Sequence, residues 1–541
     1  MKLYKLRPGR NALLVTVTFL VLATSTLLWI SKDRTPPPWD PSDHLTAAYD
    51  YYQPLAKADF ARFAKNFFVE PHYYAPFVHL VTAVFFLIFG ASRFSGVAVN
   101  LVSLAVLLIS VYWIGGKLYS AGDSQAGSAV DTGRGEGTGP ARSASRPMPD
   151  SQPKGPLFSA GAVAAVLAAC YHFPAWLLHD AFLDFPLIAI VAAAAALLIK
   201  ADDFKHRRDA LAFGVVAGLG LLTKQTFAFF FVLPGLYAAG RVVIRRDWRA
   251  MLNLALAVLV MSAIAAVWYL PHLKDVIEIY RVNQKAAIDE HEAPLFSFLS
   301  NATYVHDLLS GQIQVIFGLL FVAGLIYSLV RFRKESLMLY LWLSSGIGAF
   351  TLIANKDMRY TVPVLPAVAL ISVCWISTAG RGQKSEGARP ARPLARVAIG
   401  AVIVSILAWS FVSFFNAQWP ASGSGYYINT PHFQWMVYSR NYFSFDHRPQ
   451  SSDWGVPDAV LAVRNDWISS DSSNGTLKPP GTGTVEPPHD QGTKLTNYEA
   501  PTLGVVVNLP YLNPSSVALY ARLLAPGRGS LPLVNVDWIV A

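Results

Sequence analysis

Residues 75–90, Ala75-Pro-Phe-Val-His-Leu-Val-Thr-Ala-Val-Phe-Phe-Leu-Ile-Phe-Gly90, decide how this chain is arranged in a membrane. The segment is apolar, but it has a proline at its start, contains His79, and is shorter than the roughly 20 residues that a spanning helix needs. It either crosses the bilayer or lies along its surface. The two alternatives give opposite orientations to every segment that follows, so the choice between them sets the fold.

The composition of the whole chain identifies its environment. Of the 541 residues, 53% are hydrophobic and 14% are charged, whereas soluble globular proteins carry about a quarter charged residues. The net charge of +10 comes from short Lys/Arg clusters between apolar runs, not from a basic stripe interleaved with aromatics, so nucleic acid is not an expected partner. Cys170 and Cys374 lie inside apolar runs and predict no disulfide or metal framework. We therefore predict a polytopic membrane protein.

Eleven further apolar runs are candidate spans. The first follows a basic N-terminus that resembles a signal peptide, but it lacks a clear small-x-small cleavage site and is expected to be retained as a helix. The eleven runs are 11–31, 94–115, 157–178, 183–200, 210–226, 227–240, 250–270, 313–330, 337–354, 361–379 and 396–416.

The positions of Lys and Arg choose between the two alternatives for 75–90. If this segment lies along the surface, six segments with 25 Lys and Arg residues face the cytoplasm, as the positive-inside rule requires. If it spans, all of them except the N-terminus move outside. We therefore predict eleven spans, with the N-terminus inside and the C-terminus outside. The six segments are the N-terminus up to Arg10, 117–154, 200–208, 241–249, 331–334 and 381–396.

This topology divides the chain into a membrane domain, residues 1–416, and an outer C-terminal tail, residues 417–541. The first outer loop, 32–93, is expected to carry interfacial helices, one of them starting beside Asp40 with Ser42 or Asp43 as its cap. Segment 271–312 forms a second outer loop.

Two segments read as linkers because they are rich in small and polar residues and lack periodicity: the cytoplasmic loop 120–156 and the flexible stretch 470–494 of the tail. Elsewhere in the tail, 454–467 and 515–524 predict helices, and a strand begins at Gly504. The predicted fold class is an all-α membrane bundle followed by a small extracytoplasmic α/β domain.

Polar residues gather at the outer ends of these spans. Ionisable side chains at a membrane boundary are costly unless they serve a site. Lys224, Lys356 and Arg359 also run against the positive-inside bias, which suits an anionic ligand such as a lipid phosphate. The alternative is that they form plain salt bridges with Asp184 and Asp357. The outer set comprises Asp40, Asp43, His44, His72, Tyr73, His179, Asp180, Asp184, Lys224, Lys356, Asp357, Arg359 and Tyr360.

A metal site is not favoured. His179, Asp180 and Asp184 have a spacing that is common by chance, and a hard cation would take more oxygen ligands. No phosphate-binding or dinucleotide-binding glycine motif with suitable flanks occurs either, so no cofactor is expected.

Four features together resemble the polyprenyl-phosphate-dependent GT-C glycosyltransferases, in the branch of protein O-mannosyltransferases and lipid A aminoarabinose transferases. They are an acidic residue after the first span, Leu183-Asp-Phe-Pro-Leu187, Gly218-Leu-Gly-Leu-Leu-Thr-Lys224, and Lys356-Asp-Met-Arg-Tyr-Thr-Val-Pro-Val-Leu-Pro366. The resemblance covers roughly residues 11–416 and leaves the tail outside.

This resemblance implies inverting transfer of a sugar from a polyprenyl-phosphate donor to a glycolipid, envelope glycan or protein on the outer face of the inner membrane. Asp40 would be the general base, with Asp43 as its competitor because relatives usually show Asp-Glu here. Asp184 would support the site. Lys224, Lys356 and Arg359 would bind the donor phosphate, and the substrate contacts would be His44, His72, Tyr73, His179, Asp180 and Tyr360.

Two other expectations complete the sequence-based hypothesis. A carboxylate near the bilayer is expected to have a raised proton affinity, which would help it to act as a base. The leading alternative function is a secondary transporter or lipid flippase, although such proteins place their charges near the bilayer midplane in paired halves, and no internal repeat is evident here.

Overall fold

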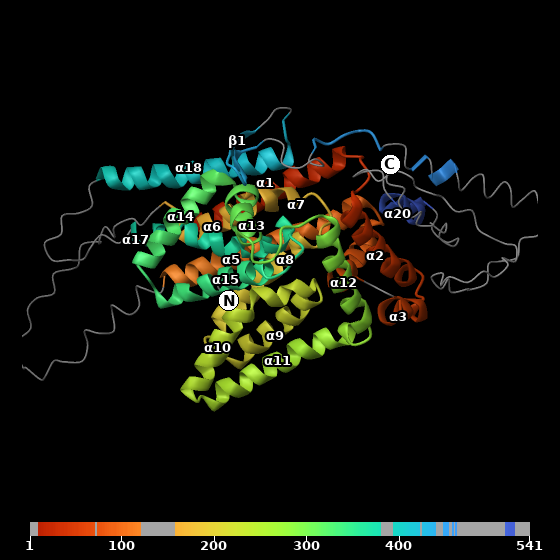
Figure 1. Ribbon diagram of the computed structural model, residues 1–541, viewed down its shortest axis with the longest axis horizontal. Coiled ribbons are helices and arrows are strands. Elements are labelled where there is room, and N and C mark those ends of the chain that lie inside the picture. The colour runs from red at the N-terminus through yellow and green to blue at the C-terminus, as the bar shows by residue number, and fades with distance from the viewer. Residues whose placement is uncertain are drawn as a thin grey trace, which may run out of the picture.

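The computed structural model describes residues 9–70, 73–120, 157–379, 393–421, 425–439, 447–453, 457–458, 460–462 and 514–524. Helices dominate this part of the chain, and its only sheet is the antiparallel hairpin of β1 (Tyr426–Asn429) and β2 (Gln434–Tyr438). In Figure 1, α1 (Arg10–Lys32) and α18 (Pro393–Gln418) run along one side of the bundle, and α9 (Arg207–Leu221), α10 (Val232–Arg245) and α11 (Trp248–Tyr269) lie on the opposite side.

Each of the eleven predicted runs contains helix. Within the described residues, four helices are long and apolar enough to cross a membrane alone: α1, α5 (Arg93–Ser120), α11 and α18. A fifth span arises if α13 (Phe298–Asp307), the π-turn η2 (Leu308–Gln312) and α14 (Gln314–Val330) count as one unit bent by 115°. The total of eleven spans stays a prediction. The remaining runs hold α6 (Ala160–Cys170), α7 (His172–Leu177), α8 (Asp184–Lys200), α9, α10, α15 (Leu337–Thr351), the 3-10 helix η4 (Met358–Val364), α16 (Leu365–Ser372) and α17 (Ile376–Ala379).

The centre of the bundle is built from small residues. Every residue of α6 is buried, and α6 and α8 both pack on α5. A Cβ added at Gly115 of α5 would lie 2.4 Å from the Cα of Gly161 in α6, so these helices cross where neither has a side chain. Small residues let membrane helices approach this closely. The result is a rigid wall behind the outer loops.

The first outer loop forms three helices, α2 (Trp39–Ala56), α3 (Phe60–Phe68) and α4 (Phe77–Phe89). The deciding segment becomes α4, which begins after Pro76, is too short to rank among the spanning helices, and packs against α2 and α5. Its orientation toward the bilayer surface stays a prediction. Two further segments are α12 (Leu273–Asp289), which follows α11, and the 3-10 turn η1 (Gln225–Phe230), which follows α9.

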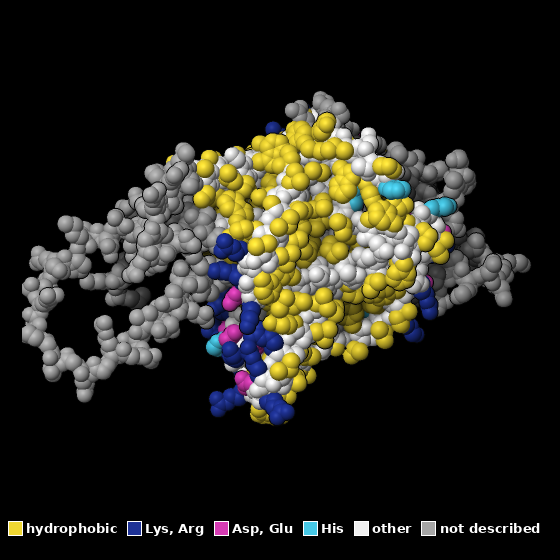
Figure 2. All heavy atoms as spheres, turned by 60° about the vertical axis from the view of Figure 1, so that its left-hand side comes forward, with side chains coloured by type: hydrophobic (Ala, Val, Ile, Leu, Met, Phe, Trp, Pro, Cys, Tyr) yellow, Lys and Arg dark blue, Asp and Glu magenta, His cyan; other side chains and the backbone are white. Residues whose placement is uncertain are grey.

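The surface is divided as a membrane protein requires. Figure 2 shows hydrophobic side chains spread over a broad face, with most of the visible Lys, Arg, Asp and Glu side chains gathered along one edge. Among the exposed apolar side chains, Leu259 of α11 and Leu319 of α14 are 63% and 67% exposed. Apolar side chains left facing outward in such numbers belong in hydrocarbon rather than in water.

In the C-terminal tail, the predicted helix at 515–524 is present as α20 (Pro514–Leu524). The predicted strand at Gly504, the flexible stretch 470–494, and most of the helix 454–467 lie outside the described residues. So does the loop 120–156, apart from its first residue. The small α/β domain therefore stays a prediction.

Candidate active site

Asp40 lies in the first turn of α2. This helix begins about one turn earlier than a cap at Ser42 or Asp43 would place it. The helix begins at Trp39, directly after Pro36, Pro37 and Pro38. Proline has no N–H to donate to a preceding turn, so it is favoured at the start of a helix and not in its interior. The predicted capping role of Ser42 or Asp43 is therefore wrong. Ser42 lies inside the helix and donates from its hydroxyl to the carbonyl of Pro37 at 2.6 Å. The first turn is a favourable place for a carboxylate, since the helix dipole is positive there.

Arg359 joins Asp40 to a second carboxylate. Its Nη1 donates to Oδ2 of Asp40 at 2.5 Å, and its Nε and Nη2 donate to Oδ2 of Asp357 at 2.8 and 2.6 Å. Asp357 also caps η4 by accepting the backbone N–H of Arg359 at 2.8 Å. The guanidinium lies over the ring of Phe182 at 5.2 Å from its centroid. Chain segments more than 300 residues apart thus meet at one cation.

These contacts set the charge states of the carboxylates. Burial would raise the pKa of Asp40, but the neighbouring positive groups, Arg359 foremost and then Lys224, together outweigh it, and the pKa lies below its usual value. Burial also opposes ionisation of Asp357, and the same guanidinium again lowers the pKa. The expected raised proton affinity is therefore wrong for Asp40, which a cation contacts. It holds for Asp43, because desolvation raises the pKa of that carboxyl to about 6. Asp40 and Asp357 are both ionised at neutral pH.

A second ion pair lies beside the first. Nζ of Lys224, in the turn between α9 and η1, donates to Oδ1 of Asp184 at the start of α8, at 2.7 Å. The two side chains are 13% and 3% exposed. Lys224 also lies over the ring of Tyr360, 5.6 Å from the centroid, and its charge acts on Asp40. Of the three cations for which salt bridges with Asp184 and Asp357 were the alternative, Lys224 pairs with Asp184 and Arg359 with Asp357.

Lys356 has a different set of partners. Its Nζ donates to the carbonyls of Phe350, Thr351 and Ile353 at 3.1, 2.9 and 2.6 Å, at the C-terminal end of α15. A cation at this end of a helix satisfies carbonyls that have no intrahelical partner. All three ammonium donors are directed at the backbone, although the residue also lines the cavity described next.

A cavity of about 400 Å³ opens at the Asp40–Arg359 pair. It is large enough for a sugar phosphate, and its walls combine charged and aromatic groups, as carbohydrate and small-ligand sites do. The lining residues are Pro38, Trp39, Asp40, Pro41, Phe173, Trp176, Phe182, Lys356, Asp357, Met358 and Arg359. Sequence reasoning missed the aromatic walls, since Phe173 and Trp176 are indistinguishable from other apolar residues of their run. Among these aromatic residues, only Trp39 could have been predicted to line the site, because it is next to Asp40 in the sequence.

Several predicted site residues lie near this cavity without lining it. His44 of α2 is buried, and its Nδ1 lies 3.2 Å from Nε2 of His79 in α4. Burial lowers the pKa of His44 to about 4, so it is neutral at pH 7. Asp43 is exposed, and its carboxylate is hydrogen-bonded by Ser515 of α20.

Other predicted residues lie elsewhere. His179 stacks on Trp29, with ring centroids 4.0 Å apart. Burial raises the pKa of Asp180 to about 6, opposed by the charge of Arg93. His179 and Asp180 therefore have partners different from that of Asp184, which pairs with Lys224. Tyr73 is 59% exposed, and His72 lies outside the described residues.

Comparisons with known proteins place part of the chain in a family. Residues 155–273 match the family described as Dolichyl-phosphate-mannose-protein mannosyltransferase. A search of curated protein sequences gives no match. The matched segment contains Asp184 and Lys224, which belong to two of the four motifs that carry the predicted resemblance.

Solved structures show weak likeness. ArnT from Cupriavidus metallidurans bound to undecaprenyl phosphate is 17% identical, with 74% of this chain and 71% of that chain covered and a TM-score of 0.43. Its apo state is 15% identical, covering 96% and 86%, with a TM-score of 0.49. Arabinosyltransferase EmbB from Mycobacterium smegmatis is 12% identical, covering 76% and 38%, with a TM-score of 0.42.

The family relation rests on the sequence match, because all three TM-scores are below 0.5. The match confirms the predicted resemblance, and the apolar helices agree with a membrane location. The chain is an integral membrane protein that resembles the GT-C glycosyltransferases, and its residues 155–273 match the mannosyltransferase family named above.

Proposed function

We propose that this chain is an inverting glycosyltransferase of the cell (inner) membrane. It moves a sugar from a polyprenyl-phosphate donor to a hydroxyl of a glycolipid, envelope glycan or protein acceptor on the outer face. One observation carries the proposal: a carboxylate and a guanidinium, Asp40 and Arg359, share the wall of a cavity sized for a sugar phosphate. The donor class is supported by the family match, since dolichyl phosphate is a polyprenyl phosphate.

Arg359 is the proposed anchor for the donor phosphate. A guanidinium has five N–H donors, and the bonds among the described residues use one each from Nε, Nη1 and Nη2. Nη1 and Nη2 therefore each retain a second N–H for phosphate oxygens. Lys224 adds a positive charge from the side of Asp184. The two cations stabilise the negative charge that grows on the departing phosphate.

Asp40 is the proposed general base. It removes the proton from the acceptor hydroxyl while the hydroxyl oxygen attacks the anomeric carbon. The bond from that carbon to the phosphate oxygen breaks, and the phosphate leaves with the electron pair. Attack from the face opposite the phosphate inverts the anomeric configuration. When the donor phosphate binds Arg359, it partly neutralises the positive charge beside Asp40. The pKa of Asp40 then rises, so donor binding makes the carboxylate a better base.

The other proposed residues support this arrangement. Asp184 fixes Lys224 by their 2.7 Å contact, and Tyr360 lies beneath the ammonium. Lys356 shapes the cavity through its bonds to the end of α15. His44 borders the charged cluster from α2. The proposal gives no direct substrate contact to His179 and Asp180, whose neighbours are Trp29 and Arg93.

The test is transfer in proteoliposomes with a panel of radiolabelled polyprenyl-phosphate sugars. A general base supplies roughly a factor of 10² to 10⁴, so Asp40→Asn should lose about that much turnover and keep donor affinity. Asp209→Asn is a matched control, because Asp209 pairs with Lys200 at the predicted cytoplasmic end. Asp43→Asn should also turn over.

Three results would oppose this assignment. If Asp43→Asn is inactive and Asp40→Asn is active, the two carboxylates exchange roles. If both variants keep full turnover, the catalytic role of this loop is wrong. If the wild-type protein moves intact labelled donor across the bilayer without transferring its sugar, the flippase alternative replaces the transferase.

A further inference from the structure

The segment that carries Asp40 is held at both ends by the C-terminal tail. This segment, residues 33–50, runs from the end of α1 to the last turns of α2. Its first end is bonded to Gln450, and its second end to Arg522 of α20. Both partners lie in the tail, outside the part of the chain that resembles the glycosyltransferases.

The first attachment is built on a buried ion pair. Gln450 donates its backbone N–H to Oδ1 of Asp33 at 2.9 Å, and its carbonyl accepts from the backbone N–H of Arg34 at 2.8 Å. On its other side, Asp33 receives Nη1 of Arg93 at 2.5 Å, and the same nitrogen donates to the carbonyl of Thr35 at 2.8 Å. The Asp33 side chain is 0% exposed.

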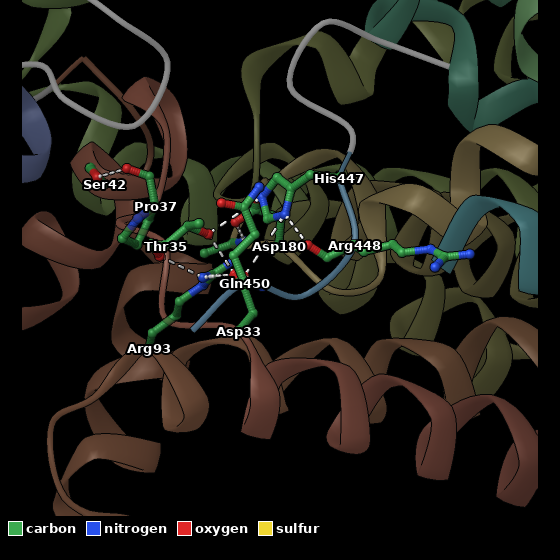
Figure 3. A network of polar contacts seen from close by, with 10 residues as sticks. Asp33, Thr35, Pro37, Ser42, Arg93, Asp180, His447, Arg448 and Gln450 are labelled. Atoms are coloured by element: carbon green, nitrogen blue, oxygen red, sulfur yellow. Dashed lines mark hydrogen bonds and ion pairs between the residues drawn. The ribbon is translucent and has the colours of Figure 1, made fainter. Parts of the chain in front are cut away.

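Figure 3 shows this arrangement, with Arg93 reaching Asp33 and Thr35 from one side and Gln450 and His447 from the other. The hydroxyl of Thr35 donates to Oδ2 of Asp33 at 2.6 Å and lies 3.4 Å from Nε2 of His447. Hydrogen bonds between buried charged groups hold their members in one geometry. The tail thus fixes the chain just before the prolines that start α2.

The second attachment is a helix contact. α20 packs along α2, and Leu519 of α20 joins a buried cluster with Leu45, Ala48 and Phe86. Nε of Arg522 donates to Oδ1 of Asp50 at 2.9 Å, and its Nη2 donates to Oδ2 at 3.4 Å. The bidentate geometry fixes register as well as distance.

We propose that the C-terminal tail is a clamp that positions α2, and through it Asp40, against Arg359 and the cavity. Asp40 lies between the two attachments and has its own partner on a different element, so its placement depends on where α2 is held. Arg522 is a positioning residue in this proposal. The proposal rests on the proposed function for the role of Asp40, but the clamping itself is independent of that function.

The experiment compares Arg522→Asp, Asp50→Arg and the exchanged pair Asp50→Arg with Arg522→Asp in the full-length protein. Hydrogen exchange of the amides in 39–50 should be faster in each single variant and return toward wild type in the exchanged pair. Turnover should fall roughly 10-fold in the single variants, since small misplacement of a catalytic group is costly, while KM for the donor is unchanged. Arg281→Asp is the control, because it disrupts an exposed pair with Glu278 on α12.

Unchanged exchange of 39–50 in Arg522→Asp overturns the clamp. An exchanged pair that stays as fast as the single variants also overturns it, because the contact would then not be the cause. A raised donor KM at constant turnover overturns the positioning of Asp40. If no donor of the panel is transferred by the wild type but exchange responds as expected, the clamp stands and the proposed function fails.

Discussion

At the scale of single residues, Arg359 makes the contacts that hold the two carboxylates of the site together. It is the only described side chain that contacts both Asp40 and Asp357, and it lines the cavity. Its charge is the main reason why Asp40, a partly buried carboxylate, stays ionised. Removing that charge therefore tests both the electrostatics and the proposed chemistry.

Arg359→Gln should move the acidic limb of the pH–rate profile to higher pH. In the wild type, Arg359 depresses the pKa of Asp40, so the base stays ionised and active until the pH falls below the usual carboxylate range. Without the guanidinium, burial dominates and raises that pKa, so activity is lost at a higher pH. Donor affinity should also fall by about 1–3 kcal/mol for a lost charge-assisted contact.

The profile is measured as kcat/KM for the donor, because kcat/KM reports the pKa of the donor-free enzyme. Arg359→Lys keeps a positive charge and should leave the limb closer to that of the wild type. An unshifted limb in Arg359→Gln would show that Asp40 is not the titrating base.

The ion pair of Lys224 and Asp184 gives a second prediction at this scale. Because both side chains are nearly buried, Asp184→Asn should leave an unpaired ammonium and cost about 3–5 kcal/mol of unfolding free energy. The double variant Asp184→Asn with Lys224→Met should be less destabilised than Asp184→Asn alone. Thermal unfolding in detergent measures both. A double variant that merely adds the two single losses would show that the pair is not coupled.

At the scale of elements, the crossing of α5 and α6 tests how tightly the bundle behind the site is packed. A Cβ at Gly161 would lie 2.6 Å from the carbonyl oxygen of Tyr112, which is backbone and cannot rotate away. Gly161→Ala should therefore destabilise the protein by about 1–3 kcal/mol. Gly116→Ala is the matched control, since a Cβ at Gly116 meets nothing within 4 Å and alanine favours a helix.

Unfolding midpoints of the two variants decide the matter. Equal midpoints would mean that α5 and α6 separate readily at this crossing, and that the wall behind the site is not rigid.

The elements also show what could be predicted from sequence. The positions of α1, α5, α11 and α18 follow from apolar length, which is a local property of the chain. The start of α2 was missed by a few residues, because the prolines before Trp39 outweighed the hydroxyl and carboxylate of Ser42 and Asp43. α20 was predicted as a helix, but nothing local indicated that it packs on α2.

The site itself was predictable only in part, because local sequence features select residues but do not show which of them touch. Charge bias along the chain singled out Lys224, Lys356 and Arg359, and the position just after the first span singled out Asp40. The contact of Asp40 with Arg359 joins distant segments, and only the packed bundle determines it. That contact is also why the pKa of Asp40 moves opposite to the expectation from burial alone.

At the scale of the whole molecule, orientation decides which compartment the site and the tail face. The clamp requires that both face the same one, since Gln450 and Arg522 contact the segment that carries Asp40. The 25 Lys and Arg residues of the predicted inner segments give the direction. The charged edge in Figure 2 is consistent with this separation of charged and apolar surfaces.

Cysteine labelling in intact cells tests the orientation. A membrane-impermeant maleimide should label Ser451→Cys directly, because Ser451 is exposed, and should reach Pro140→Cys only after permeabilisation. Val460 is a poorer reporter for the tail, since it is 1% exposed. The native Cys170 and Cys374 are buried, and the unsubstituted protein measures their background. Direct labelling of Pro140→Cys together with protection of Ser451→Cys would invert the topology and move Asp40, Arg359 and the clamp to the cytoplasmic side. The proposed outer-face transfer would then be wrong, although the geometry of the site would be unchanged.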